Sequence, residues 1–287
     1  MQTIFGSVGT ILRMIKIEHS IFALPYAWAG CCLAANGLPS LRTFVYLTLA
    51  MIAIRSVAMA FNRLADLPYD RLNPRTQMRP LVTGAITKSQ TVGFCVCMSY
   101  LFIFSCGALN ETCFWLSFLA LAIVIVYSYL KRYTSLCHFW LGGTLGLAPI
   151  AGWLSISPTT LPLAPILLAL AVLFWVGAFD IYYAFLDVDF DRAYGLHSVP
   201  ADMGTDKALA IAGFSHGMTA IFLVLTGYAA NLSIWWYIIC AGITFLLVCE
   251  HKLMLPKDLR YVNTAFFTFN GIIAPIMLGG ILLGLFC

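Results

Sequence analysis

Nine long apolar runs constrain this chain more than any other feature of its sequence. They cover residues 20–35, 44–61, 92–109, 113–130, 139–155, 163–179, 208–229, 232–249 and 262–286. A helix needs about 20 mainly apolar residues to cross about 30 Å of hydrocarbon, and most of these runs approach that length. Only 10% of the residues are charged, against about a quarter in soluble domains. The sequence therefore predicts an all-α polytopic membrane protein with nine transmembrane helices in one bundle.

The positive charges are distributed so that they fix an orientation for these nine helices. With the N-terminus in the cytoplasm, every Lys and Arg except Arg42 and Arg55 falls in the cytoplasmic segments or at their edges. The two longest polar loops, residues 62–91 and 180–207, lie on that side and form a polar cap. We therefore expect one integral domain, residues 1–287, in the cell (inner) membrane. The net charge of +4 follows from this sidedness and does not indicate nucleic-acid binding.

The first polar loop begins with an acidic cluster at the end of an apolar run. Asn62, Asp66 and Asp70 are spaced by four residues, which places them on one helical face. Two stacked carboxylates repel each other unless a cation lies between them. Because Mg²⁺ prefers a few carboxylates together with water and phosphate oxygens, this spacing predicts a magnesium site. A solvated charged loop is the alternative interpretation.

Basic residues on the same side of the membrane are suited to phosphate. Arg71, Arg75 and Arg79 follow the acidic cluster directly, and guanidinium groups match phosphate oxygens in geometry. A third cytoplasmic connection adds Lys131 and Arg132, which are either diphosphate ligands or simply a pair that obeys the positive-inside rule. Together the acids and bases predict a metal-diphosphate site at the membrane surface.

A second acidic cluster follows the sixth apolar run. Asp180, Asp187 and Asp191 share a helical face, and Tyr183 lies one turn before Asp187. Two acidic walls that face each other would hold two or more Mg²⁺ ions bridged by a diphosphate. The aromatic face of Tyr183 is suited to a cation. Arg55 is a charge inside an apolar run, where it either binds a substrate carboxylate or pairs with an acid.

Four motifs, in this order, resemble those of the UbiA superfamily of intramembrane aromatic prenyltransferases. They are Asn62-x-x-x-Asp66-x-x-x-Asp70, Asn73-Pro74-Arg75-Thr76 with Arg79-Pro80-Leu81, Leu130-Lys131-Arg132-Tyr133-Thr134, and Asp180-x-x-Tyr183-Ala184-x-x-Asp187-x-x-x-Asp191. The last two motifs are most similar to the 4-hydroxybenzoate polyprenyltransferase branch. The N-terminal segment, residues 16–25, is instead similar to a subgroup that prenylates a dihydroxynaphthoate.

This resemblance implies a Mg²⁺-dependent transfer of a polyprenyl group from polyprenyl diphosphate to a ring carbon of 4-hydroxybenzoate, a step in ubiquinone biosynthesis. The alternative acceptor is a dihydroxynaphthoate, for menaquinone biosynthesis. The implied partners are polyprenyl diphosphate, a small aromatic acid and the lipid bilayer, and we expect neither nucleic acid nor an obligate protein partner.

The candidate residues have three roles. The candidate catalytic residues are Asp66, Asp70, Asp187, Asp191 and Tyr183. The candidate substrate-binding residues are Arg55, Asn62, Arg75, Arg79, Lys131, Arg132 and Asp180. The candidate metal ligands are Asn62, Asp66, Asp70, Asp187 and Asp191.

Other classes of protein fit the sequence less well. A secondary transporter would place ionisable residues near the bilayer midplane, whereas these acids gather at one face. A soluble isoprenyl diphosphate synthase also uses two aspartate-rich motifs, but it needs no membrane spans. Within the family, haem or chlorophyll acceptors remain open.

Overall fold

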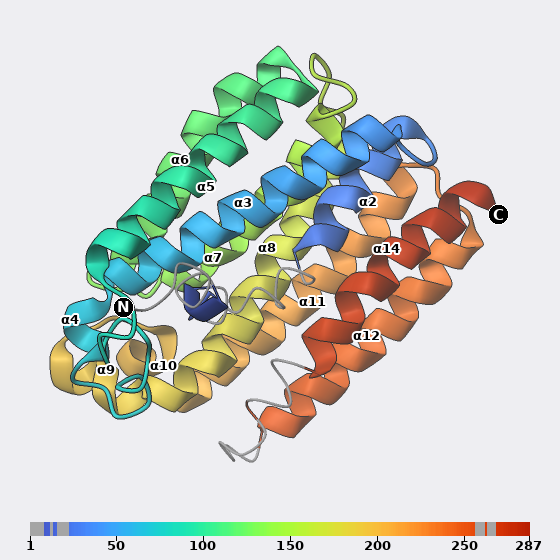
Figure 1. The fold of residues 1–287 in the computed structure, drawn as a ribbon. Coiled ribbons are helices and arrows are strands. Elements are labelled where there is room, and N and C mark those ends of the chain that lie inside the picture. Colours follow the sequence, from blue (N-terminus) through green and yellow to red (C-terminus); the bar gives the residue numbers. More distant parts are fainter. Residues whose placement is uncertain (1–8, 12–13, 16–22, 256–261, 263–267) are drawn as a thin grey trace.

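The computed structural model describes residues 9–11, 14–15, 23–255, 262 and 268–287, and every element in this part of the chain is helical (Figure 1). The elements are α2 (Leu24–Ala35), α3 (Leu41–Ala65), α4 (Leu67–Asp70), α5 (Lys88–Leu109), α6 (Glu111–Leu130), α7 (Cys137–Leu154), α8 (Leu163–Ala184), the 3₁₀ turn η2 (Phe185–Asp187), α9 (Val188–Tyr194), α10 (Val199–Met203), α11 (Thr205–Ala229), α12 (Ile234–Met254) and α14 (Asn270–Phe286).

Each of the nine apolar runs overlaps one helix in the described part of the chain. Six helical stretches there are long and apolar enough to cross a membrane: α3, α5, α6, the stretch from α8 through α9, α11 and α12. α2 and α14 are shorter apolar helices. The all-helical, membrane-integral architecture is thus confirmed, while the count of nine spans stays a prediction. Parts of two runs, residues 20–22 and 263–267, lie outside the described residues.

Local capping explains where several long helices begin. The Ser40 hydroxyl accepts a hydrogen bond from the Thr43 N–H at the start of α3. Thr87 and Gln90 form a reciprocal capping box at the start of α5. Asn110 caps α6, and its amide also donates to the Leu154 carbonyl at 2.9 Å. This last bond ties the start of α6 to the end of α7.

Glycines bring α7 very close to α2 and α8. A Cβ atom added at Gly30 would lie 1.9 Å from the Pro149 carbonyl oxygen, and one at Gly152 would lie 1.9 Å from that of Ala27. A Cβ at Gly142 would lie 2.1 Å from the Leu173 carbonyl oxygen. A side chain at Gly30, Gly142 or Gly152 would therefore force the helices apart, so these glycines permit the close packing of α7 on α2 and α8.

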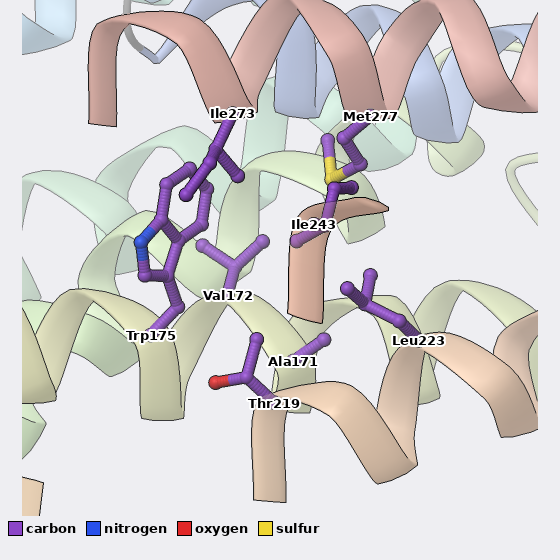
Figure 2. Close-up of a pocket in the computed structure, with 8 residues that line it drawn as sticks. All are labelled: Ala171, Val172, Trp175, Thr219, Leu223, Ile243, Ile273 and Met277. Carbon is purple, nitrogen blue, oxygen red and sulfur yellow. The ribbon is translucent and has the colours of Figure 1, made fainter. Parts of the chain in front are cut away.

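The main core lies where α2, α7, α8, α11, α12 and α14 pack together. Figure 2 shows a cavity within it that has room for about one water molecule, about 10 Å³. Apolar side chains surround it almost completely, and Thr219 is the one polar residue in its lining. This cavity is too small for an isoprenoid chain, and its walls carry no group that does chemistry.

The polar cap gathers at one end of the bundle, at the lower left of Figure 1. It contains α4, α9 and α10 together with the loop of residues 71–87. The ends of α3, α6 and α8 and the starts of α5, α7 and α11 meet there, while the C-terminus lies at the opposite end. The fold therefore brings both acidic clusters and the basic loops to one end of the molecule.

Candidate active site

The first acidic cluster lies where α3 ends and α4 begins. Asn62 donates through Nδ2 to Asp66 Oδ2 at 2.9 Å, as expected for residues four apart on one helical face. Asp70 is buried at the end of α4, and both of its carboxylate oxygens lie 2.6 Å from Arg79 Nη1. A basic residue from the following loop therefore folds back onto the acidic motif that precedes it.

Arg75 crosses from the same loop to the second acidic cluster. Its Nε donates to Asp187 Oδ1 at 2.9 Å, and its Nη2 contacts Asp187 Oδ2, so that the pair is bidentate. Its Nη1 donates to the Tyr183 hydroxyl at 2.9 Å, and Cζ lies 5.2 Å from the Tyr183 ring centroid. Asn73 also donates to Asp187 Oδ1, at 3.0 Å. The loop and the end of α8 are thus joined at one carboxylate.

Asp191 is the most deeply buried acid of the second cluster. It is fully shielded from solvent, and Lys131 Nζ lies 2.8 Å from its Oδ1. Ser198 donates to Oδ2 at 2.9 Å. The Lys131 carbonyl accepts from the His197 N–H at 2.7 Å, which fixes the connection between α6 and α7 against the one between α9 and α10.

Asp180 lies one helical turn before Tyr183 and binds a histidine. His138, buried at the start of α7, has its Nδ1 2.7 Å from Asp180 Oδ2. The Val199 N–H donates to His138 Nε2 at 3.2 Å. Because Nε2 accepts, Nδ1 carries the proton and donates it to Asp180. This histidine therefore links α7, α8 and α10.

The charges of the site act on one another across these elements. Burial and, to a lesser extent, the negative charge of Asp70 raise the pKa of Asp66 to about 6, while Lys131 is among the cations that oppose this shift. Burial lowers the pKa of Lys131, but the carboxylate of Asp191 outweighs that effect and leaves the pKa above its usual value. Residues from the junction of α3 and α4, from α4, from the loop after α6 and from α9 therefore form one electrostatic unit.

The donor set has the chemistry of a hard divalent cation. Asp66, Asp70, Asp187 and Asp191 offer only oxygen ligands, which Mg²⁺ prefers over nitrogen and sulfur. In the described part of the chain, no three His, Cys, Asp or Glu side chains converge tightly enough to hold a metal by themselves. A metal held here would need further oxygen ligands from water or from a phosphate.

The structure brings together most of the residues that the sequence singled out, but it places two of them elsewhere. The guanidinium group of Arg132 lies over the rings of Tyr69 and Tyr129, at 5.3 and 4.9 Å from the centroids. Its Nη2 donates to the Ala65 carbonyl. Arg55 is half-buried within α3, about two turns before Asn62.

Sequence reasoning missed three residues that position the acids. His138 was given no functional role from the sequence, yet it binds Asp180. Asn73 and Ser198 were not considered, yet they donate to Asp187 and Asp191. One signal was available, because Asn73 lies inside one of the four motifs quoted above.

Comparisons with known proteins find similarity over most of the chain. A sequence model of the UbiA prenyltransferase family matches residues 23–272. The chain is 30% identical over 273 residues to a 4-hydroxybenzoate octaprenyltransferase of Yersinia pseudotuberculosis serotype IB (strain PB1/+), covering 93% of each chain.

Solved structures show the same fold. The apo structure of a UbiA homologue from Aeropyrum pernix K1 is 31% identical, with a TM-score of 0.85, and the match covers 93% of this chain and 98% of that one. A UbiA homologue from Archaeoglobus fulgidus, bound to GPP and Mg²⁺, is 23% identical, with a TM-score of 0.74 and coverage of 95% and 99%.

Proposed function

The chain belongs to the UbiA prenyltransferase family, and on that premise we propose that it transfers a polyprenyl group from polyprenyl diphosphate to a ring carbon of 4-hydroxybenzoate. The observation that carries the proposal is the pairing of acids with bases at one end of an apolar bundle: Asp70 with Arg79, Asp187 with Arg75, and Asp191 with Lys131. The acids suit a divalent cation, and the bases suit the diphosphate.

Two carboxylates from each acidic motif would hold Mg²⁺: Asp66 and Asp70 on one side, Asp187 and Asp191 on the other. When bound, Mg²⁺ neutralises the charge that develops on the leaving diphosphate. Asn62 orients Asp66 through a hydrogen bond from its side-chain amide, and His138 orients Asp180 through a hydrogen bond from its ring Nδ1. These hydrogen bonds hold the oxygen donors in place before substrate arrives.

The basic residues would bind the diphosphate by exchanging partners. Arg75, Arg79 and Lys131 each contact a carboxylate in the free protein. Diphosphate binding then replaces a carboxylate oxygen with a phosphate oxygen at each base. Because the exchange is between two charge-assisted contacts, the net cost of releasing each base is small.

In the reaction the C–O bond of the diphosphate breaks, and its electron pair leaves with the diphosphate. The allylic carbon then bonds to the ring carbon next to the phenol, and that ring carbon loses its proton to restore aromaticity. The Tyr183 ring already holds the guanidinium of Arg75 near its face, so it is suited to stabilise an allylic cation. Asp187 is the candidate acceptor of the ring proton.

Membrane placement completes the proposal. The acidic motifs would face the cytoplasm at the surface of the inner membrane, since the cap carries most of the Lys and Arg residues. The prenyl chain is apolar, so it would lie in the hydrocarbon region of the membrane. The whole chain would act as one domain.

The test is product formation in membranes that contain the protein, supplied with geranyl diphosphate, Mg²⁺ and either 4-hydroxybenzoate or a dihydroxynaphthoate. We expect prenylated hydroxybenzoate, and its loss with EDTA. Prenylated naphthoate alone would move the acceptor to the menaquinone alternative. The matched variants are Asp187→Asn, which should abolish the product, and Asp189→Asn, an exposed acid two residues away that should not. Product that persists undiminished in Asp187→Asn would contradict the proposal.

A further inference from the structure

A second cationic feature of the cap lies outside the acidic site. The guanidinium group of Arg132 lies over the rings of Tyr69 and Tyr129, and Arg132 has no ion pair with a carboxylate among the described residues. Its Nε atom is buried and has no hydrogen-bond partner within the described residues. A buried donor without a partner carries a desolvation cost, so the charge of Arg132 is incompletely compensated within the described residues.

Arg132 lines a surface pocket of about 330 Å³. The pocket lies where α3 ends, α4 runs, α5 begins and α6 ends, at the cap end of the bundle (Figure 1). It is large enough for a phosphate group with part of its organic substituent. Its lining residues are Leu64, Ala65, Leu67, Pro68, Arg71, Lys88, Tyr129 and Arg132.

The charges of this pocket are unbalanced. Arg71, Lys88 and Arg132 all line it, and no acidic residue does. Within the part of the chain that the structure describes, none of the three makes an ion pair with a carboxylate. By contrast, Arg75 and Lys131, which lie in the same two loops as Arg71 and Arg132, both do. Three cations that share one pocket repel each other unless an anion lies among them.

The surroundings of the pocket indicate where that anion comes from. In the most apolar 18-residue segment of α5, only 22% of the segment is buried inside the protein, and the same holds for α6. Both helices therefore have most of their surface free to contact lipid. The pocket lies at the cap ends of these two helices, where lipid headgroups would surround helices that cross a membrane, and Leu64, Leu67 and Pro68 give it an apolar wall. Basic pockets between helices at this depth attract anionic lipids.

We propose that this pocket binds the phosphate group of an anionic phospholipid. The guanidinium groups of Arg71 and Arg132 and the ammonium group of Lys88 contact its oxygens, and the apolar wall contacts its glycerol and upper acyl carbons. The site is separate from the carboxylate cluster and does not depend on the reaction proposed above.

The experiment measures lipid retention by the full-length protein in nanodiscs, using native mass spectrometry with phosphatidylglycerol and phosphatidylcholine of matched acyl chains. The test variant is the double substitution Arg71→Gln/Lys88→Gln. The matched control, Lys207→Gln/Lys252→Gln, removes the same charge from exposed positions on α11 and α12. A charge-preserving variant, Arg71→Lys/Lys88→Arg, separates loss of charge from loss of fold.

We expect the wild type, the matched control and the charge-preserving variant to retain one phosphatidylglycerol in preference to phosphatidylcholine. In the test variant the affinity for phosphatidylglycerol should fall by about fivefold for each charge removed, about 25-fold in total. Equal loss in both charge-removing variants, or equal retention of the two lipids by the wild type, would overturn the proposal. Inorganic phosphate that occupies the site while phosphatidylglycerol does not would overturn the assignment to a lipid.

Discussion

The contact between Arg75 and Asp187 joins residues 112 positions apart, and replacing Asp187 by Asn tests its two roles separately. The substitution keeps the size of the side chain and one oxygen acceptor. It removes the negative charge that receives two guanidinium contacts from Arg75 and one amide bond from Asn73. Stability should therefore fall modestly, while turnover should fall greatly because the charge serves the metal and the diphosphate.

The magnitude for stability follows from the contacts. A hydrogen bond to a charged group contributes about 1.5–3 kcal/mol, and Asn can still accept one of the two bonds from Arg75. The Arg75 side chain is 32% exposed, so solvent screens the pair. We expect the free energy of unfolding to fall by about 1–2 kcal/mol. Turnover should fall by about 100-fold or more, which corresponds to about 2.7 kcal/mol of lost transition-state stabilisation.

The assay is a double-mutant cycle of Arg75→Gln and Asp187→Asn, with unfolding by urea in detergent micelles followed by tryptophan fluorescence. If the pair is coupled, the double variant should lose about 1–2 kcal/mol less than the sum of the single variants. Turnover of each variant is measured in parallel. Asp189→Asn is the control, because that acid is exposed and should change neither quantity.

Two results would refute this reasoning. Additivity of the two substitutions within about 0.5 kcal/mol would mean that the contact contributes no coupling energy. Near-normal turnover in Asp187→Asn would mean that the charge of this residue has no part in the reaction.

Three further predictions concern other parts of the molecule. Because the pKa of Asp66 is raised to about 6, its carboxyl group becomes mostly neutral below that pH. The apparent affinity for Mg²⁺ in the transfer assay should therefore fall between pH 7 and pH 5. An affinity that does not change over this range would contradict the assignment of Asp66 as a metal ligand. Gly152→Ala would place a Cβ atom 1.9 Å from a backbone oxygen of α2, so it should strongly lower the midpoint temperature of thermal unfolding. Gly217→Ala is the control: its Cβ would have no atom within 4 Å, so the midpoint should stay unchanged or rise slightly. His138→Phe removes the donor to Asp180 and should reduce kcat much more than His138→Gln, which keeps a donor; equal activity of the two variants would exclude a positioning role.

Both acidic motifs and the helical architecture could be predicted because their signals are local. An apolar run specifies a membrane helix by its length, whatever lies beside it. The spacing of Asn62 and Asp66 specifies a shared helical face, and their hydrogen bond has the expected form. The concentration of basic residues on one side predicts that both acidic motifs lie at the same end of the bundle, and Figure 1 places them there.

The partners of the basic residues could not be predicted in this way. Arg79 folds back to Asp70 within its own loop, whereas Arg75, only four residues earlier, reaches Asp187. Lys131 and Arg132 are adjacent in sequence, yet one binds Asp191 and the other lines a separate pocket. His138 shows no local signal for its bond to Asp180, which joins two helices.

The sequence by itself therefore determined that this protein is embedded in a membrane, that it is helical, and that its cap contains acidic and basic residues. These features follow from the length of the apolar runs and from helical spacing, which are both local properties of the chain. Only the tertiary structure decided which cation meets which carboxylate. Long basic side chains reach several partners at nearly equal cost, and the choice among them depends on how α3, α6 and the end of α8 converge at the cap.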